Sequence, residues 1–112
     1  MDKDYVIERF QQTKDQAPGY AKMREEAKVI GIWDDHDFGI NDGGKDFEFK
    51  DQNRELFLDF VDEPADSERR SQKGTPIHQD YFVTKNDKTV HVILLDGRYE
   101  LDRETGDRLG RD

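Results

Sequence analysis

One stretch constrains the fold of this chain more than any other. The apolar run Val29–Trp33 leads directly into the acidic sequence Asp34-Asp35-His36-Asp37. The run is short, continuous and β-branched, which predicts a strand covered on both faces, as in an α/β sheet. Carboxylates gathered where a buried strand ends are costly unless something pairs with them, and a metal ion or a phosphate is a usual partner. We therefore predict an α/β fold with a site at this strand end.

The overall charge excludes two classes of partner. Acidic residues number 27 and basic residues 18, so the formal net charge is −9. Nucleic-acid-binding proteins need a basic footprint, and anionic membranes attract basic segments, so neither partner is expected. The sequence has no apolar run of membrane-spanning length and no signal-peptide core, which leaves the compartment unassigned. Cysteine is absent, so thiolate ligands and disulfides are excluded.

The size of the expected core is small. Hydrophobic residues make up 32% of the chain and charged residues 40%, a balance close to that of disordered proteins. The aromatic residues, 11% of the chain, oppose that trend because each can bury a large apolar area. We expect a chain that is only partly self-sufficient, as a piece of a larger protein would be.

The pattern divides the chain into five stretches: a helical lead-in over 1–27, a strand with an Asp/His loop over 28–50, a helix over 51–62, a strand pair over 77–99 and a polar tail over 100–112. Within the lead-in, apolar spacing predicts helices over Asp4–Gln12, with Asp4 as N-cap, and over Tyr20–Ala27.

The later elements have clearer signals. An apolar stripe and a following proline predict a helix over Asp51–Val61, with Asp51 as its cap. Two β-rich runs, Gln79–Thr84 and Thr89–Leu95, flank the turn residues 85–88 and predict a hairpin.

Asp34, Asp35 and His36 are the candidate functional residues. Carboxylate oxygens and a neutral imidazole are ligands for divalent cations, and a bound cation would stabilise carboxylates packed together. His36 could instead be a general acid whose charge state the aspartates set. The simpler alternative is a polar loop in which the acids cap backbone groups. An EF-hand loop starting at Asp37 is rejected, because its sixth position would need glycine.

Weaker candidates surround this group. Asn41 and Asp42 could orient the ligands, or could form an Asx turn before the glycine pair. Arg98 follows the second apolar strand and could grip a phosphate, although a structural pair with a carboxylate is the preferred interpretation. The remaining side chains are expected to have structural roles: Trp33 as a wall of the site, Arg69 and Arg70 as a solvated face, and His78 and His91 as ordinary strand residues.

Several blocks together resemble one known family. The sequence Val29-Ile-Gly-Ile-Trp-Asp-Asp-His-Asp-Phe-Gly-Ile-Asn-Asp-Gly-Gly44 is similar to the central signature of the PhoD-like (alkaline phosphatase D type) metallophosphatases. Later blocks follow in the family's order: Phe57-Leu-Asp-Phe60, Glu68-Arg-Arg70 and Val92-Ile-Leu-Leu-Asp-Gly-Arg-Tyr99. The resemblance extends from about Tyr20 to Gly110, and its Trp-Asp-Asp-His-Asp block is the specific part.

The resemblance implies a phosphomonoesterase or phosphodiesterase with a calcineurin-like α/β sandwich, in which metals activate water and clamp the displacement. Carried over by position, Asp35 would be a metal ligand and Asp34 an auxiliary one. His36 would stabilise the phosphoryl oxygens or protonate the leaving alkoxide. The family's metals imply calcium with iron, with manganese or zinc as alternatives, and the substrate would be a phosphate ester.

The chain also departs from the family pattern. No aspartate-rich motif precedes Val29, no Gly-Asp-x-His block follows, and Asp96-Gly97-Arg98 stands where the family has Asp-Thr-Arg. Two carboxylates and one histidine are too few for a dinuclear site. We therefore expect an incomplete domain, a central fragment without activity of its own. The alternative is a non-catalytic acidic module that binds a divalent cation or a partner protein.

Overall fold

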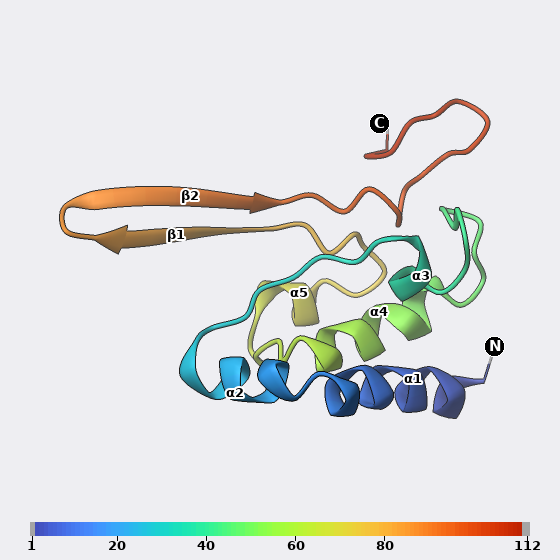
Figure 1. The fold of residues 1–112 in the computed structure, drawn as a ribbon. Coiled ribbons are helices and arrows are strands. Elements are labelled where there is room, and N and C mark those ends of the chain that lie inside the picture. The colour runs from blue at the N-terminus through green and yellow to red at the C-terminus, as the bar shows by residue number, and fades with distance from the viewer. Residues whose placement is uncertain (1, 111–112) are drawn as a thin grey trace.

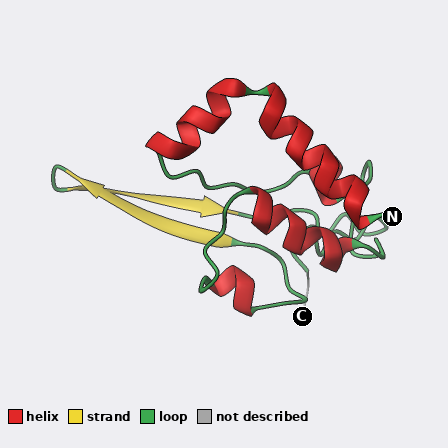
Figure 2. Cartoon of the chain, turned by 90° about the horizontal axis from the view of Figure 1, so that it is seen from below, coloured by secondary structure: helices red, strands yellow, loops and turns green. Residues whose placement is uncertain are grey.

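The computed structural model describes residues 2–110 as a mixed α/β fold (Figure 1). Two helices at the N-terminal end lie beside a third, central helix, and a hairpin of two strands extends away from all of them (Figures 1 and 2). In chain order the elements are α1 Lys3–Gln16, α2 Pro18–Glu26, α3 Asp35–Phe38, α4 Lys50–Phe60, α5 Glu68–Ser71, β1 Gln79–Lys85 and β2 Lys88–Leu94. None of the described helices is long and apolar enough to cross a membrane.

The two N-terminal helices are confirmed with different boundaries. The first begins earlier than predicted, because Asp2 and not Asp4 is its N-cap: the Asp2 carboxylate accepts the Asp4 backbone N–H at 2.9 Å. Proline at the first position of α2 is compatible with a helix start, since that N–H would lack a partner anyway. Phe10 fixes α1 to α4 by stacking on Phe60 at 4.8 Å between ring centroids.

The central helix α4 is confirmed within a residue of its prediction, but its predicted cap is wrong. The helix begins at Lys50, with Phe49 in the capping position and no side-chain cap. Asp51 already lies inside the first turn, and its carboxylate accepts a hydrogen bond from the Tyr99 hydroxyl at 2.5 Å. The Asp51 carboxylate therefore binds the C-terminal part of the chain and does not cap α4.

The hairpin is confirmed. Its strands pair antiparallel in a register that places Gln79 opposite Leu94 and Lys85 opposite Lys88. Asn86 and Asp87 form the turn with φ of 52° and 60°, the left-handed region that a two-residue hairpin turn requires. These two strands are the whole of the sheet in the described part of the chain.

The predicted strand Val29–Trp33 is wrong as a strand. Among the described residues, no backbone–backbone hydrogen bond reaches residues 28–33, so no ladder forms along them. The segment carries a strand-like sequence but lacks a neighbour, and pairing with a neighbour is what defines a strand. The prediction of cover on both faces holds only for Trp33, which is buried, whereas Val29 to Ile32 are half-buried.

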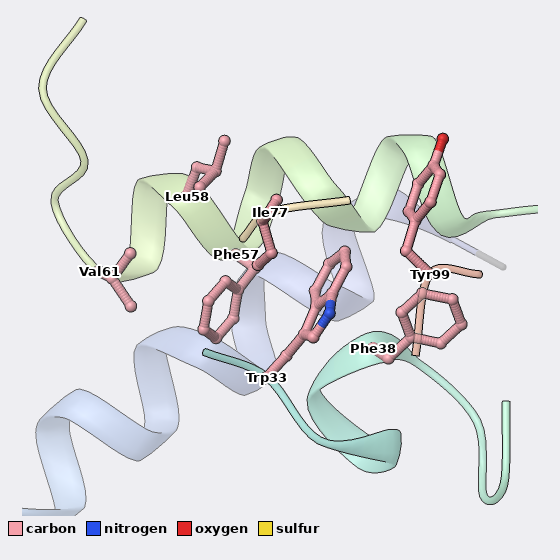
Figure 3. Close-up of a cluster of buried hydrophobic side chains, with 7 residues drawn as sticks. All are labelled: Trp33, Phe38, Phe57, Leu58, Val61, Ile77 and Tyr99. Atoms are coloured by element: carbon pink, nitrogen blue, oxygen red, sulfur yellow. The ribbon is translucent and has the colours of Figure 1, made fainter. Parts of the chain in front are cut away.

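The hydrophobic core lies between α4 and the segment that contains Trp33 (Figure 3). Aromatic rings dominate it: Trp33 meets Phe38 edge-on at 5.0 Å and Phe57 at 5.5 Å between centroids. Such contacts add to the free energy of simple area burial. Seven buried residues form the cluster: Trp33, Phe38, Phe57, Leu58, Val61, Ile77 and Tyr99.

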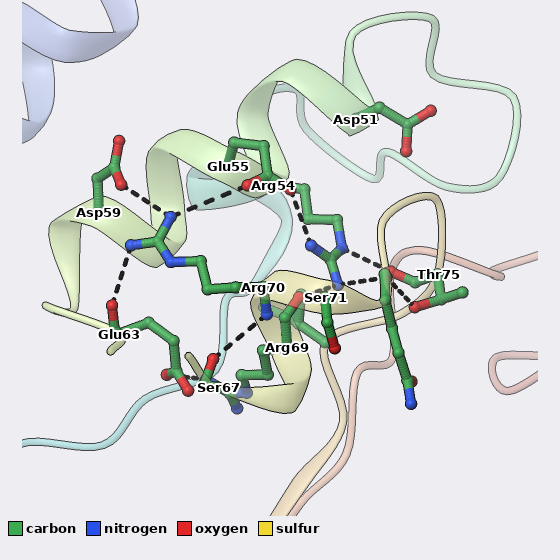
Figure 4. Close-up of polar contacts among 12 residues, drawn as sticks. Asp51, Arg54, Glu55, Asp59, Glu63, Ser67, Arg69, Arg70, Ser71 and Thr75 are labelled. Atoms are coloured by element: carbon green, nitrogen blue, oxygen red, sulfur yellow. Dashed lines mark hydrogen bonds and ion pairs between the residues drawn. The ribbon is translucent and has the colours of Figure 1, made fainter. Parts of the chain in front are cut away.

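The prediction that Arg69 and Arg70 form a solvated face is wrong, because both are bound near α4, as is Arg54 of α4 itself (Figure 4). Arg54 is 1% exposed and donates to the carbonyl oxygens of Thr75, Arg69 and Gln72 at 2.7, 2.7 and 2.9 Å. Arg69 is 3% exposed, and Arg70 pairs with Asp59 at 2.8 Å. The arginines fasten α5 and its following loop to α4, because the carbonyls of this irregular segment need donors.

A buried carboxylate joins distant parts of the chain. Asp96 is 0% exposed, and its Oδ1 accepts from Trp33 Nε1 at 2.8 Å and from the Arg98 and Tyr99 backbone N–H groups at 2.9 and 3.0 Å. Its Oδ2 accepts from the Ile77 N–H at 3.0 Å. A buried charge is tolerable only when it is hydrogen-bonded in this way.

Replacing this carboxylate should destabilise the whole fold. Asp96→Ala would leave three buried donors and one part-buried donor without an acceptor, so we expect the free energy of unfolding to fall by at least about 3 kcal/mol. Urea denaturation, monitored by Trp33 fluorescence, measures this change in the free energy of unfolding. The exposed Asp66→Ala is the matched control and should change stability by less than about 0.5 kcal/mol. Equal stability of the two variants would contradict the role of Asp96.

Candidate functional site

All predicted site residues except Arg98 lie in one tight turn between Trp33 and the glycine pair, and Arg98 reaches this turn from the segment after β2. Asp34 is the N-cap of the four-residue helix α3, and the Asp37 carboxylate reaches back to accept the Asp34 N–H at 3.2 Å. Trp33 and Phe38, buried at 4% and 0% exposure, anchor the two ends of this short helix in the core. The polar residues between them are therefore held at the surface by apolar neighbours on both sides.

Asp35 is oriented by backbone donors. Its Oδ2 accepts the Asp42 N–H at 3.0 Å and its Oδ1 accepts the His36 N–H at 2.9 Å. The bond from Asp42 is the main cause of a pKa below the ordinary value for this carboxyl, with further lowering by His36 and Arg98. Asp35 thus stays charged and fixed in direction, which a carboxylate ligand requires.

Asp34 faces a different partner. The Arg98 guanidinium donates from Nε at 2.8 Å and from Nη2 at 2.6 Å, both to Asp34 Oδ1. The structure therefore places Arg98 in the carboxylate pair that the sequence favoured. Both bonds from Arg98 go to one Asp34 oxygen, so the pair places a carboxylate and a cation side by side at the start of the turn.

His36 is exposed, and it lines a cavity of about 310 Å³ that the sequence did not reveal. The opposite wall of this cavity comes from α1, which contributes Tyr5, Arg9 and Thr13. No spacing rule could bring Arg9 near His36, because the approach depends on how α1 packs on α4. The imidazole has space beside it for a ligand, and Arg9 contributes a cationic side chain to the lining of the same cavity.

The far end of the turn is closed by the glycine pair and the tail. Asn41 Nδ2 donates to Asp42 Oδ2 at 3.0 Å, and Asp42 adopts a φ of 55°. A Cβ on Gly44 would lie 2.5 Å from the Leu101 carbonyl oxygen, so only glycine allows the tail to pack there. Asn41 and Asp42 shape the loop, and through its N–H Asp42 also orients Asp35.

The other two histidines have local partners. His78 Nδ1 accepts the Asp96 N–H at 2.8 Å, and His91 Nε2 lies 2.8 Å from Asp80 Oδ2 across the hairpin. Neither is brought to the Asp34–Asp42 turn.

A metal centre is not assembled by these residues alone. Within residues 2–110, no group of three or more histidine, aspartate or glutamate side chains is placed to hold an ion. Asp34 and Asp35 face separate partners, and the Asp35 oxygens each accept a backbone N–H. The turn offers oriented carboxylates of the right chemistry, but it does not provide the ligand number that a structural or catalytic metal needs.

Comparison with known proteins adds no assignment. No family model matches the chain, and neither curated proteins nor solved structures gave a match.

The lowered pKa of Asp35 predicts an acid-sensitive turn. Because the folded pKa lies below the ordinary value of 3.8, the charged carboxylate stabilises the turn above that pH. The contribution is lost as pH falls through the lower, folded pKa. An NMR titration of the Asp42 amide proton should therefore show a midpoint below 3.8 that Asp35→Asn abolishes. A midpoint above this value would contradict the orientation of Asp35 by Asp42.

Proposed function

We propose that this chain carries part of the active site of a metal-dependent phosphoric ester hydrolase of the PhoD-like type. The complete enzyme would have the layered α/β sandwich of the calcineurin-like metallophosphatases. The observation that carries the proposal is the Asp34–Asp42 turn itself. It combines a charged, oriented Asp35 with an exposed His36 beside a cavity, on the sequence block that resembles the family signature.

The geometry supports a separate role for each of three residues in this proposal. Asp35 has its charge and direction fixed by two backbone N–H groups, as a ligand needs. His36 stands free at the surface and can donate a proton or a hydrogen bond to a phosphoryl oxygen or to the leaving alkoxide. Asp34 is held by Arg98, so it is suited to an auxiliary role next to a cation that can attract the phosphate.

The metals would supply an activated water and neutralise the developing charge, with calcium and iron as the ions that the resemblance implies. The residues of this turn are too few to hold such ions, so the proposal requires further ligands from elsewhere. For that reason we expect the chain by itself to bind a divalent ion weakly and to hydrolyse no phosphate ester.

Paramagnetic relaxation by Mn²⁺ measures the expected weak binding of a divalent ion directly. Adding Mn²⁺ to the ¹⁵N-labelled chain should broaden the amide signals of residues 34–42 before those of other acidic segments. Asp35→Asn should weaken this binding about tenfold or more, as loss of an oriented ligand does. Asp102→Asn is the matched control, since Asp102 also accepts backbone N–H bonds in an exposed acidic turn. Equal broadening of both turns would contradict a specific site.

Hydrolysis of p-nitrophenyl phosphate and bis-p-nitrophenyl phosphate, with calcium, iron or manganese and a chelator control, gives the second readout. Chelator-sensitive turnover lost in Asp35→Asn would show that the chain completes the site itself. In any longer product of the gene, His36→Ala should lower kcat by a factor of about 10²–10⁴. Unchanged turnover there would contradict the role of His36, whereas metal binding without hydrolysis would favour a non-catalytic acidic module that binds a divalent cation or a partner protein.

A further inference from the structure

We propose that two copies of this chain associate by strand addition. The hairpin of one copy adds its free β2 edge along the unpaired segment 28–33 of the other. The acceptor half of this pairing is the segment itself. Among the described residues no backbone–backbone hydrogen bond reaches it, and only its Gly31 carbonyl accepts a side-chain donor, Arg69 Nη1 at 3.1 Å. An extended apolar stretch with unpaired donors and acceptors is a template for another strand.

Space for an additional strand lies beside the first half of this segment, at residues 28–30. A cavity of about 430 Å³ has Val29 and Ile30 on one side and Gln79 and Tyr81 of β1 on the other. Apolar side chains of Val61 and Pro64 contribute to its lining. An incoming strand would therefore meet backbone groups and apolar surface together, which is how added strands gain both affinity and register.

The hairpin supplies the donor half. It extends beyond the helices in both views (Figures 1 and 2), and two strands alone are marginally stable in water. Apolar side chains on both faces are exposed, among them Phe82 at 68%, Val90 at 60% and Ile93 at 59%. A strand edge with these side chains would gain from burial against a third strand.

A second copy is the occupant to which these observations point, because each chain carries both halves of the interface. Reciprocal addition, hairpin to segment and segment to hairpin, would close a two-fold dimer and leave neither half exposed.

Mass measurement by light scattering during size-exclusion chromatography tests the proposal. The wild-type chain should run as a dimer that dissociates on dilution, and Val90→Lys with Ile93→Lys should make it monomeric.

Proline variants test the acceptor segment. Successive N–H groups of an extended chain point to opposite edges, so one of Val29→Pro and Ile30→Pro should also abolish the dimer, and the other should retain it. Val29→Ala and Ile30→Ala keep the N–H group and should remain dimeric. Ile7→Lys places the same charge on an exposed residue of α1 and should have no effect.

Mixing the two monomeric variants tests whether the hairpin of one copy pairs with the segment of the other. The monomeric proline variant retains its hairpin and the lysine variant retains its segment, so a mixture of the two should restore a heterodimer through one interface. A mixture that stays monomeric would overturn hairpin-to-segment pairing, as would a wild-type chain that is monomeric at every concentration. Circular dichroism of each variant confirms that it is folded.

Discussion

The Asp96 carboxylate is the interaction on which the arrangement of this molecule depends. Four donors converge on it, from Trp33, Ile77, Arg98 and Tyr99. They come from the segment before the acidic turn, from the approach to β1 and from the residues after β2. Such a charge is costly to bury and is retained only when every donor is in place, so this contact fixes the relative positions of all three segments. The hydrophobic core alone would constrain them less closely.

The candidate site inherits its geometry from this contact. Trp33 is bound through its indole N–H, and the next residue begins the turn that orients Asp35. On the other side, Arg98 follows Asp96 closely and meets Asp34, while Tyr99 reaches the Asp51 carboxylate on α4. Burial of the ring and, after it, the hydrogen bond to that carboxylate raise the Tyr99 pKa far above its ordinary range, so this hydroxyl remains a donor. The buried Asp96 carboxylate therefore helps to fix the position of the turn that carries Asp35.

The sequence predicted the elements whose signals are local. The hairpin, α4 and the N-terminal helices depend on turn residues and apolar spacing that lie within each segment. The strand Val29–Trp33 could not be judged in this way, because a strand exists only if a partner lies beside it. The buried arginines were missed for a similar reason: Arg54 and Arg69 look like solvated charge until the carbonyls that they satisfy are brought near them. A pair of Arg98 with a carboxylate was favoured from composition, but its partner Asp34 was not named, and the cavity that Arg9 and His36 both line depends on the packing of the helices.

Hydrogen exchange of the backbone amides that Asp96 accepts tests this account most directly. The N–H groups of Ile77, Arg98 and Tyr99 belong to irregular segments, so without the carboxylate they should exchange quickly. If Asp96 holds the three segments together, these amides exchange only when the whole chain unfolds, as slowly as the amides of α4. Exchange at the rate of exposed loop amides would contradict the account, because the segments would then open independently of the core.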